Sequence, residues 1–181
     1  MQKFNFTPFP NLTTNRLILR QLSGNDSKEI FSLRTDKRVN KYLDRQIQRN
    51  SNEVIEFINN INKSIHENKS VYWAICLKDK KEIVGTICLF SFSEENMTAE
   101  IGYELHPNFQ KKGIMNESLN AVIEFALSIL KLDSIDAFVH KNNDSSIKLL
   151  ERNNFVIAAN RSDEENINLV GYKLMKEYEK H

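Results

Sequence analysis

Residues 105–119, LHPNFQKKGIMNESL, connect an extended apolar segment to a helix through a short basic turn. The turn holds Gln110, Lys111, Lys112 and one glycine, Gly113. The first backbone N–H groups of a helix have no partner within the helix, and the helix dipole adds partial positive charge at that end. The pattern therefore predicts a site for a phosphate or pyrophosphate, although a solvated basic loop that caps a helix would read the same way.

The whole chain has the composition of one globular domain that spans residues 1–181. It has 181 residues, of which 40% are hydrophobic and 27% are charged. The formal net charge of +1 gives no electrostatic reason to expect nucleic acid or an acidic membrane as a partner. Cys76 and Cys88 lie in apolar, strand-like runs without metal-ligand spacing, so we expect reduced core thiols and no metal. Because no apolar run has the length of a signal peptide or a membrane span, we expect a cytoplasmic protein. Either a monomer or a homodimer is expected.

The first half of the chain reads as a strand, two helices and a hairpin. Residues 16–20 predict the strand, and residues 24–26 offer an N-cap for a first helix. The basic segment 37–50 is expected to be a loop or a broken helix. Ser51 can cap a second, amphipathic helix, whose apolar residues recur at helical spacing: Val54, Ile58, Ile61 and Ile65. The apolar runs 71–77 and 83–90 flank a charged turn and predict a hairpin.

The second half alternates strands and helices. Apolar and polar residues alternate over 98–105, which predicts a strand, and a helix with one apolar stripe follows the basic turn. A strand at 134–139, a helix at 144–152 and closing strands at 155–159 and 167–175 complete the order. The helix after the fourth main strand permits parallel pairing with the fifth. We therefore expect an α/β (α+β) fold with a mixed, mostly antiparallel sheet of about seven strands flanked by helices.

Three segments, in this order and spacing, resemble the GNAT superfamily of N-acetyltransferases. Residues 99–105 with Pro107 look like its fourth strand, and residues 110–115 look like its acyl-coenzyme A motif, Gln/Arg-x-x-Gly-x-Gly/Ala. Asn143-x-x-Ser146 with the following Leu-Leu-Glu-Arg and Asn-Phe looks like its closing motif. The early TNRLILR at residues 14–20 is similar to the opening of the branch that acetylates ribosomal-protein N-termini (RimJ/RimL type). The resemblance covers nearly the whole chain.

The resemblance implies acetyl-CoA as the co-substrate. It assigns binding to the strand end, the basic turn with the helix start, and the closing motif: Leu105, Gln110, Lys111, Lys112, Gly113, Ile114, Met115, Asn116, Asn143 and Ser146. Two residues depart from the family pattern. Met115 replaces a small residue, so its side chain is expected to point away from the pyrophosphate. Asn154 replaces a glycine and is expected to take the left-handed conformation that ends a helix.

The resemblance also implies catalytic roles. Glu100 matches the position of the general base in histone-acetylating members, although an α-amine could need only a water relay because its pKa is near 8. Many members protonate the leaving thiolate with a tyrosine, where this chain has Leu150. The ribosomal-protein branch is thought to use the serine instead, which makes Ser146 the expected acid or thiol hydrogen-bond donor.

We therefore expect an acetyl-CoA-dependent N-acetyltransferase that acts on a primary amine, most similar to those that act on protein N-terminal α-amines. A small amine such as a polyamine or an aminoglycoside is the alternative acceptor. A further alternative is a module that binds acyl-CoA without catalysis. Contacts with the acceptor are expected in the segments 37–50 and 160–168.

Overall fold

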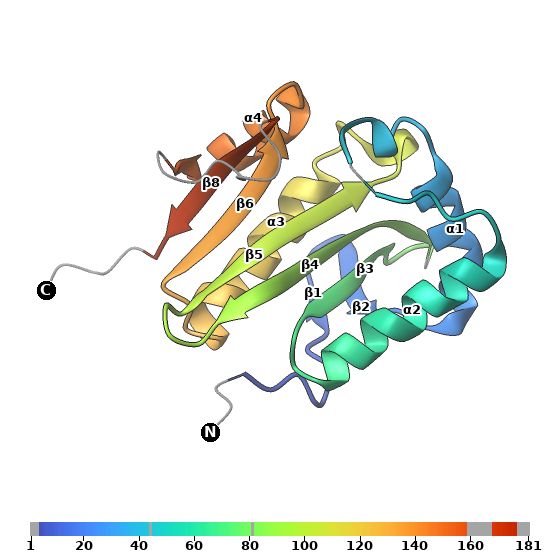
Figure 1. Ribbon diagram of the computed structural model, residues 1–181, viewed down its shortest axis with the longest axis horizontal. Coiled ribbons are helices and arrows are strands. Elements are labelled where there is room, and N and C mark those ends of the chain that lie inside the picture. Colours follow the sequence, from blue (N-terminus) through green and yellow to red (C-terminus); the bar gives the residue numbers. More distant parts are fainter. Residues whose placement is uncertain (1–3, 44, 81, 159–167, 177–181) are drawn as a thin grey trace, which may run out of the picture.

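The computed structural model describes residues 4–43, 45–80, 82–158 and 168–176. Within them, eight strands form one sheet in the order β1-β2-β3-β4-β5-β6-β8-β7 (Figure 1). The strands are β1 (Leu12–Thr13), β2 (Leu17–Gln21), β3 (Val71–Leu77), β4 (Ile83–Ser93), β5 (Thr98–Leu105), β6 (Ser134–His140), β7 (Val156–Ile157) and β8 (Leu169–Met175). β5 and β6 pair in parallel, and every other pair is antiparallel. The predicted mixed, mostly antiparallel sheet is confirmed, with the short β1 as an additional strand.

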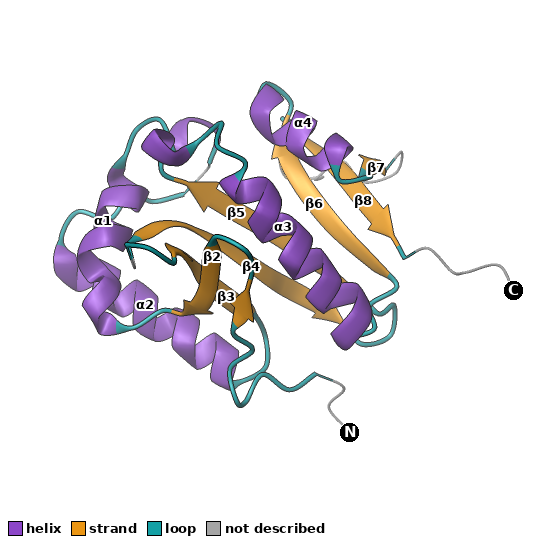
Figure 2. Ribbon diagram, turned by 180° about the vertical axis from the view of Figure 1, so that it is seen from behind, coloured by secondary structure: helices purple, strands orange, loops and turns teal. Residues whose placement is uncertain are grey.

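Four helices cover the sheet: α1 (Ser27–Thr35), α2 (Ser51–His66), α3 (Ile114–Glu124) and α4 (Asp144–Arg152). Figure 1 shows α1 and α2 on one face, and Figure 2 shows α3 and α4 on the other. Three short 3-10 turns, η1 (Gly24–Asp26), η2 (Asn40–Tyr42) and η3 (Pro107–Phe109), and a π-helical extension of α3, η4 (Phe125–Ile129), complete the described elements. No helix in the described ranges combines the length and the apolar character needed to cross a membrane.

Local sequence signals explain most element boundaries. Asn50, rather than Ser51, caps α2, because its side chain accepts a hydrogen bond from the Glu53 backbone N–H at 3.1 Å. Asn154 follows α4 with a φ of 63°, the left-handed conformation that the sequence predicts for it. The strand expected at 155–159 is shorter than predicted, since β7 ends at Ile157. Residue 159 and most of the segment 160–168 lie outside the described residues.

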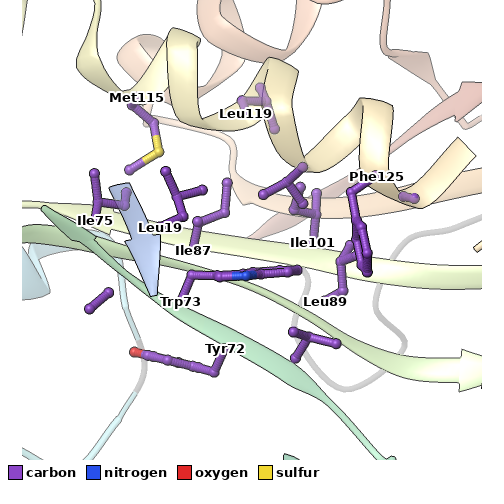
Figure 3. Packing of buried hydrophobic residues seen from close by; sticks show 14 of the residues in the cluster. Leu19, Tyr72, Trp73, Ile75, Ile87, Leu89, Ile101, Met115, Leu119 and Phe125 are labelled. Atoms are coloured by element: carbon purple, nitrogen blue, oxygen red, sulfur yellow. The ribbon is translucent and has the colours of Figure 1, made fainter. Parts of the chain in front are cut away.

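The main core lies between α3 and the centre of the sheet (Figure 3). Trp73 on β3 is fully buried, and its ring meets that of Phe125 edge to face at a centroid distance of 5.6 Å. Met115 and Leu119 point from α3 towards Leu19 and Ile75 of the sheet. The core thereby fixes the position of the first turn of α3 relative to β5.

The two parallel strands stay together over a short distance only. β5 and β6 pair at three positions, from Thr98 opposite Ser134 to Glu100 opposite Asp136. Beyond Glu100, β5 pairs only with β4, and β6 pairs only with β8. Figures 1 and 2 show the two strands diverging towards their C-terminal ends. The divergence leaves an opening between residues 101–105 of β5 and residues 137–140 of β6, whose facing edges have no neighbouring strand in the part of the chain that the structure describes.

Candidate active site

The basic turn after β5 presents free backbone N–H groups at the start of α3. Gly113 is the N-cap with a φ of 74°, and Lys111 is also left-handed with a φ of 60°. Within the described part of the chain, none of the backbone N–H groups of residues 111–116 has a hydrogen-bond acceptor. Such a run of donors, together with the positive end of the helix dipole, suits a phosphate or pyrophosphate group. The turn therefore has the backbone geometry of a phosphate-binding site.

Arg16, at the entrance to β2, holds this turn in place. Its Nη1 donates to the Lys112 carbonyl oxygen at 3.0 Å, and its Nε lies 2.7 Å from Glu117 Oε2 on α3. The other Glu117 oxygen accepts from Thr14 Oγ1 at 2.6 Å and from the Arg16 backbone N–H at 2.9 Å. Burial acts to raise the pKa of Glu117, but these hydrogen bonds and Arg16 outweigh burial and hold it below its usual value. The opening motif TNRLILR therefore ties the N-terminal strand to the anion-binding turn.

Several other residues predicted to bind acetyl-CoA support the turn or pack beneath it. Gln110 supports the end of β5, because its Nε2 donates to the Leu105 carbonyl oxygen at 3.1 Å. Met115 is only 8% exposed and packs in the core, which confirms that its side chain points away from the turn. Ile114 is buried as well. The Asn116 side chain accepts from Asn153 Nδ2 at 3.0 Å, so it links the first turn of α3 to the end of α4.

The closing motif lies across the opening from β5. Asn143 caps α4, because its side chain accepts from the Ser146 backbone N–H at 3.2 Å. The Ser146 hydroxyl lies 2.7 Å from the hydroxyl of Tyr103 on β5. Burial raises the pKa of Tyr103 to about 12, so the phenol stays protonated at neutral pH. Leu150 is 1% exposed and belongs to the core.

The predicted base Glu100 lies elsewhere on β5. It stands opposite Asp136, in the section where β5 and β6 are still paired. Since side chains alternate along a strand, Glu100 and Tyr103 leave β5 on opposite faces. The structure therefore does not bring Glu100 and Ser146 together, and the role of Glu100 as a base, directly or through water, stays a prediction.

Glu104 shares the face of Glu100 but has cationic partners. It is buried, with Oε2 2.6 Å from Arg45 Nη1 and Oε1 3.7 Å from Arg34 Nη1. Sequence reasoning did not single out Arg16, Tyr103 or Arg34, and it placed acceptor contacts in the segment 37–50, which contains Arg45, without naming the residue. Among the described residues, no group of three His, Cys, Asp or Glu side chains is placed to hold a metal ion.

Comparisons with known proteins agree with this geometry. Residues 16–156 match the model of the acetyltransferase (GNAT) domain. The chain is 32% identical over 147 residues to the uncharacterised N-acetyltransferase YoaA of Bacillus subtilis, covering 81% of this chain and 83% of the relative. It is 25% identical over 143 residues to the spermidine N(1)-acetyltransferase of Vibrio cholerae, covering 78% and 80% of the two chains.

A solved structure shares the fold. The structure of RimL, a ribosomal alpha-N-protein acetyltransferase in complex with coenzyme A, superimposes with a TM-score of 0.80 at 18% identity, covering 92% of this chain and 98% of that one. The family model spans most of the chain, and relatives covered over most of their length are named N-acetyltransferases. The chain therefore belongs to the GNAT family and is an acetyl-CoA-dependent N-acetyltransferase.

Proposed function

We propose that the protein transfers the acetyl group of acetyl-CoA to the α-amine of a protein N-terminus. The observation that carries the proposal is the hydrogen bond between Tyr103 and Ser146 across the opening, with Leu150 buried where many family members place an acidic tyrosine. A serine in this role is the arrangement that the resemblance assigns to the ribosomal-protein branch. The fold shared with RimL supports the same acceptor.

We propose one continuous path for the co-substrate. The N–H groups of residues 111–116 suit its pyrophosphate, and the unpaired edge of β5 at residues 101–105 suits the amide-bearing pantetheine arm, which can add to it as a strand would. Asn143 and Ser146 lie on the far side of the same opening. Acetyl-CoA supplies the activated acetyl thioester, and the protein contributes the position of each group and the protons.

The transfer forms a bond between the amine nitrogen and the acetyl carbonyl carbon, and it breaks the bond from that carbon to sulfur. One proton leaves the nitrogen and passes to water, while the sulfur gains one proton. In our proposal Ser146 donates that proton to the sulfur, and Tyr103 donates to Ser146 in turn. Water then restores the proton of Tyr103, so a neutral amine reacts without net proton release.

The positions of Glu100 and Glu104 on β5 also favour an α-amine as the acceptor. An α-amine is about a tenth neutral at pH 7, whereas less than about a thousandth of a lysine side chain is neutral. A lysine acceptor would demand a strong base close to the amine. Glu104 is paired with two arginines, and Glu100 leaves β5 on the face opposite Tyr103, so neither carboxylate lies beside the Tyr103–Ser146 pair. An N-terminal amine needs no more than a water relay.

Acetylation of a polyamine is the second candidate. The Vibrio cholerae relative bears the name spermidine N(1)-acetyltransferase. A hollow of about 180 Å³ lies between α1 and the end of β5, and two carboxylates, Glu29 and Glu82, line it together with His106. Two carboxylates could receive a cationic chain, so this acceptor belongs in the same test.

Release of coenzyme A thiol from a panel of three acceptors tests the proposal. The acceptors are a peptide with a free N-terminus, the same peptide with a blocked N-terminus and an internal lysine, and spermidine. We expect turnover with the free N-terminus, and a rate at limiting peptide that rises with pH through an apparent pKa near 8. Turnover with spermidine or the blocked peptide alone would contradict the proposed acceptor and leave the N-acetyltransferase assignment intact.

A further inference from the structure

Three charged side chains are buried together beside the opening, on the face away from α3 and α4. Arg34 comes from α1, Arg45 from the segment that joins α1 to α2, and Glu104 from β5. Their side chains are 11%, 18% and 7% exposed, respectively. We name these three residues the arginine cluster. Buried charges of this kind are costly unless they are paired and hydrogen-bonded.

Most of the polar atoms in the arginine cluster have partners from the fold. Arg34 Nε donates to Gln48 Oε1 at 3.0 Å, and its guanidinium lies over the ring of Phe57 at 3.9 Å. Arg45 Nε donates to Asn40 Oδ1 at 2.7 Å. Glu104 Oε1 accepts from Thr86 Oγ1 at 3.3 Å. These contacts hold both guanidinium groups in fixed positions.

Two buried atoms of the arginine cluster have no hydrogen-bond partner among the described residues. Arg45 Nη2 is buried and has no hydrogen-bond partner among the described residues. Glu104 Oε2 lies 2.6 Å from Arg45 Nη1, but no donor of a described residue is aligned with it as a hydrogen bond. Two positive charges face one negative charge, so the cluster has a surplus of one positive charge, and the buried NH2 group of Arg45 Nη2 has no acceptor among the described residues.

The arginine cluster lies beside the opening between β5 and β6, through which the acceptor would approach the acetyl group in the proposed function. Glu104 immediately precedes Leu105, in the section of β5 that has separated from β6. The segment that carries Arg45 also contacts the end of β6, since the ring of Tyr42 lies 5.3 Å from that of His140. This segment therefore extends over the opening from the side of β5 to the side of β6.

Given acetyl transfer to an N-terminal α-amine, on which this assignment rests, we propose that Arg45 binds a carboxylate of the acceptor. The preferred acceptor then carries an acidic group close to its amine, such as an aspartate in the second position of a peptide. A carboxylate would neutralise the surplus charge and give Arg45 Nη2 its missing acceptor. A polycationic amine would meet the same surplus charge as repulsion.

Matched acceptor pairs test this assignment. The peptides Ser-Asp-Ala-Ala and Ser-Asn-Ala-Ala, both with amidated C-termini, differ in one carboxylate, and so do the α-amides of aspartic acid and asparagine. For the wild type we expect kcat/KM to be about ten-fold or more higher for the acidic member of each pair, as the loss of a hydrogen bond between charged groups would predict. Arg45→Gln should reduce that ratio to about one, and Glu104→Gln, which removes the competing carboxylate, should increase it.

Arg38→Gln is the matched control, because Arg38 is an exposed arginine of the same segment that pairs with Asp36. It should leave the ratio as in the wild type. A rise in thermal midpoint with acetyl-CoA shows for each variant that the fold and the co-substrate site are intact. Where an acceptor gives no turnover, its affinity measured by calorimetry with coenzyme A present replaces kcat/KM.

Equal values for both members of each pair in the wild type would overturn the assignment, as would a preference that survives Arg45→Gln. If both peptides fail and the amino-acid amides show a preference that depends on Arg45, the carboxylate site stands and the protein N-terminus is excluded as the acceptor. The two proposals can therefore fail separately.

Discussion

The hydroxyl groups of Tyr103 and Ser146 lie 2.7 Å apart, although the two residues belong to elements on opposite sides of the opening between β5 and β6. The phenol is protonated at neutral pH, and burial raises its pKa further, to about 12, so either hydroxyl can donate the hydrogen bond between them. In the proposed mechanism Tyr103 donates to Ser146, and the Ser146 hydroxyl donates its hydrogen to the sulfur of the co-substrate. The pair would then form a short proton path in place of the tyrosine that Leu150 replaces.

Removal of the serine hydroxyl should slow the chemical step. We expect Ser146→Ala to lower kcat by about 10²-fold, because general acid catalysis contributes about 10² to 10⁴. The rise in thermal unfolding midpoint that acetyl-CoA causes should be the same as in the wild type, because the variant keeps the N–H groups of residues 111–116. Ser145→Ala, at an exposed serine of the same helix, is the control and should behave as the wild type. A wild-type rate for Ser146→Ala would remove the residue from the mechanism.

In the proposed mechanism Tyr103 acts through Ser146 and is a positioning residue. Tyr103→Phe should lower kcat by about 10-fold and leave KM for acetyl-CoA within about two-fold, as expected when an interaction made in the transition state is removed. The double variant with Ser146→Ala should be only slightly slower than Ser146→Ala alone, because neighbouring residues of one network are not additive. Fully additive losses in kcat would show that Tyr103 does not work through the serine.

A side chain at Gly113 should prevent acetyl-CoA from binding at the turn of residues 110–113. Gly113 has a φ of 74°, and a Cβ atom there would lie 3.4 Å from Arg16 Nη2. We expect acetyl-CoA to raise the thermal midpoint of the wild type and to have little effect on Gly113→Glu, whose carboxylate repels the pyrophosphate. Gly24→Ala is the control, since a Cβ at Gly24 meets nothing within 4 Å. A full shift in Gly113→Glu would place the pyrophosphate elsewhere.

The order of elements was predictable because their signals are local. Apolar residues recur along α2 at the period of a helix, and Asn143 occupies the N-cap of α4 as its sequence indicates. The small elements were harder to predict. β1 has only two residues and was not predicted, and β7 is shorter than the strand predicted at 155–159.

The candidate site was only partly predictable, because a sequence motif identifies only residues that lie near each other in the chain. The turn at residues 110–115 and the Asn143–Ser146 pair are of that kind. Contacts between distant residues leave no such signal: Arg16 pairs with Glu117 at a separation of 101 residues, and Tyr103 meets Ser146 at a separation of 43. Alternation along β5 places Tyr103 on the apolar face, but only the fold shows that its hydroxyl reaches α4.

A methyl group at Gly85 should displace the end of β5. A Cβ atom there would overlap the Glu104 carbonyl oxygen and lie 2.9 Å from Leu105 Cδ1. The backbone cannot yield as a flexible side chain does, so we expect Gly85→Ala to destabilise the fold by about 1–3 kcal/mol and to raise KM for acetyl-CoA. Gly102→Ala is the comparison on the paired strand, because its nearest neighbours are side chains at 3.4 Å. Urea denaturation and initial rates measure both effects, and an unchanged KM for Gly85→Ala would show that the position of the strand end is not critical.

The ion pair that anchors α3 should make stability depend on pH. The pKa of Glu117 lies below its ordinary value of 4.5 in the folded protein, so its contribution to stability is present above that value and is lost as the pH falls through the folded-state pKa. We expect Glu117→Gln to cost about 1 kcal/mol at pH 7, a modest figure because Arg16 is half exposed. The difference in free energy of unfolding between wild type and variant should stay constant from pH 7 to about 5. It should disappear at lower pH, where protonated Glu117 resembles glutamine. Urea denaturation over this range measures the difference, with Glu124→Gln, at an exposed carboxylate of the same helix, as the control. A difference that grows in acid would reverse the assigned direction of the pKa shift.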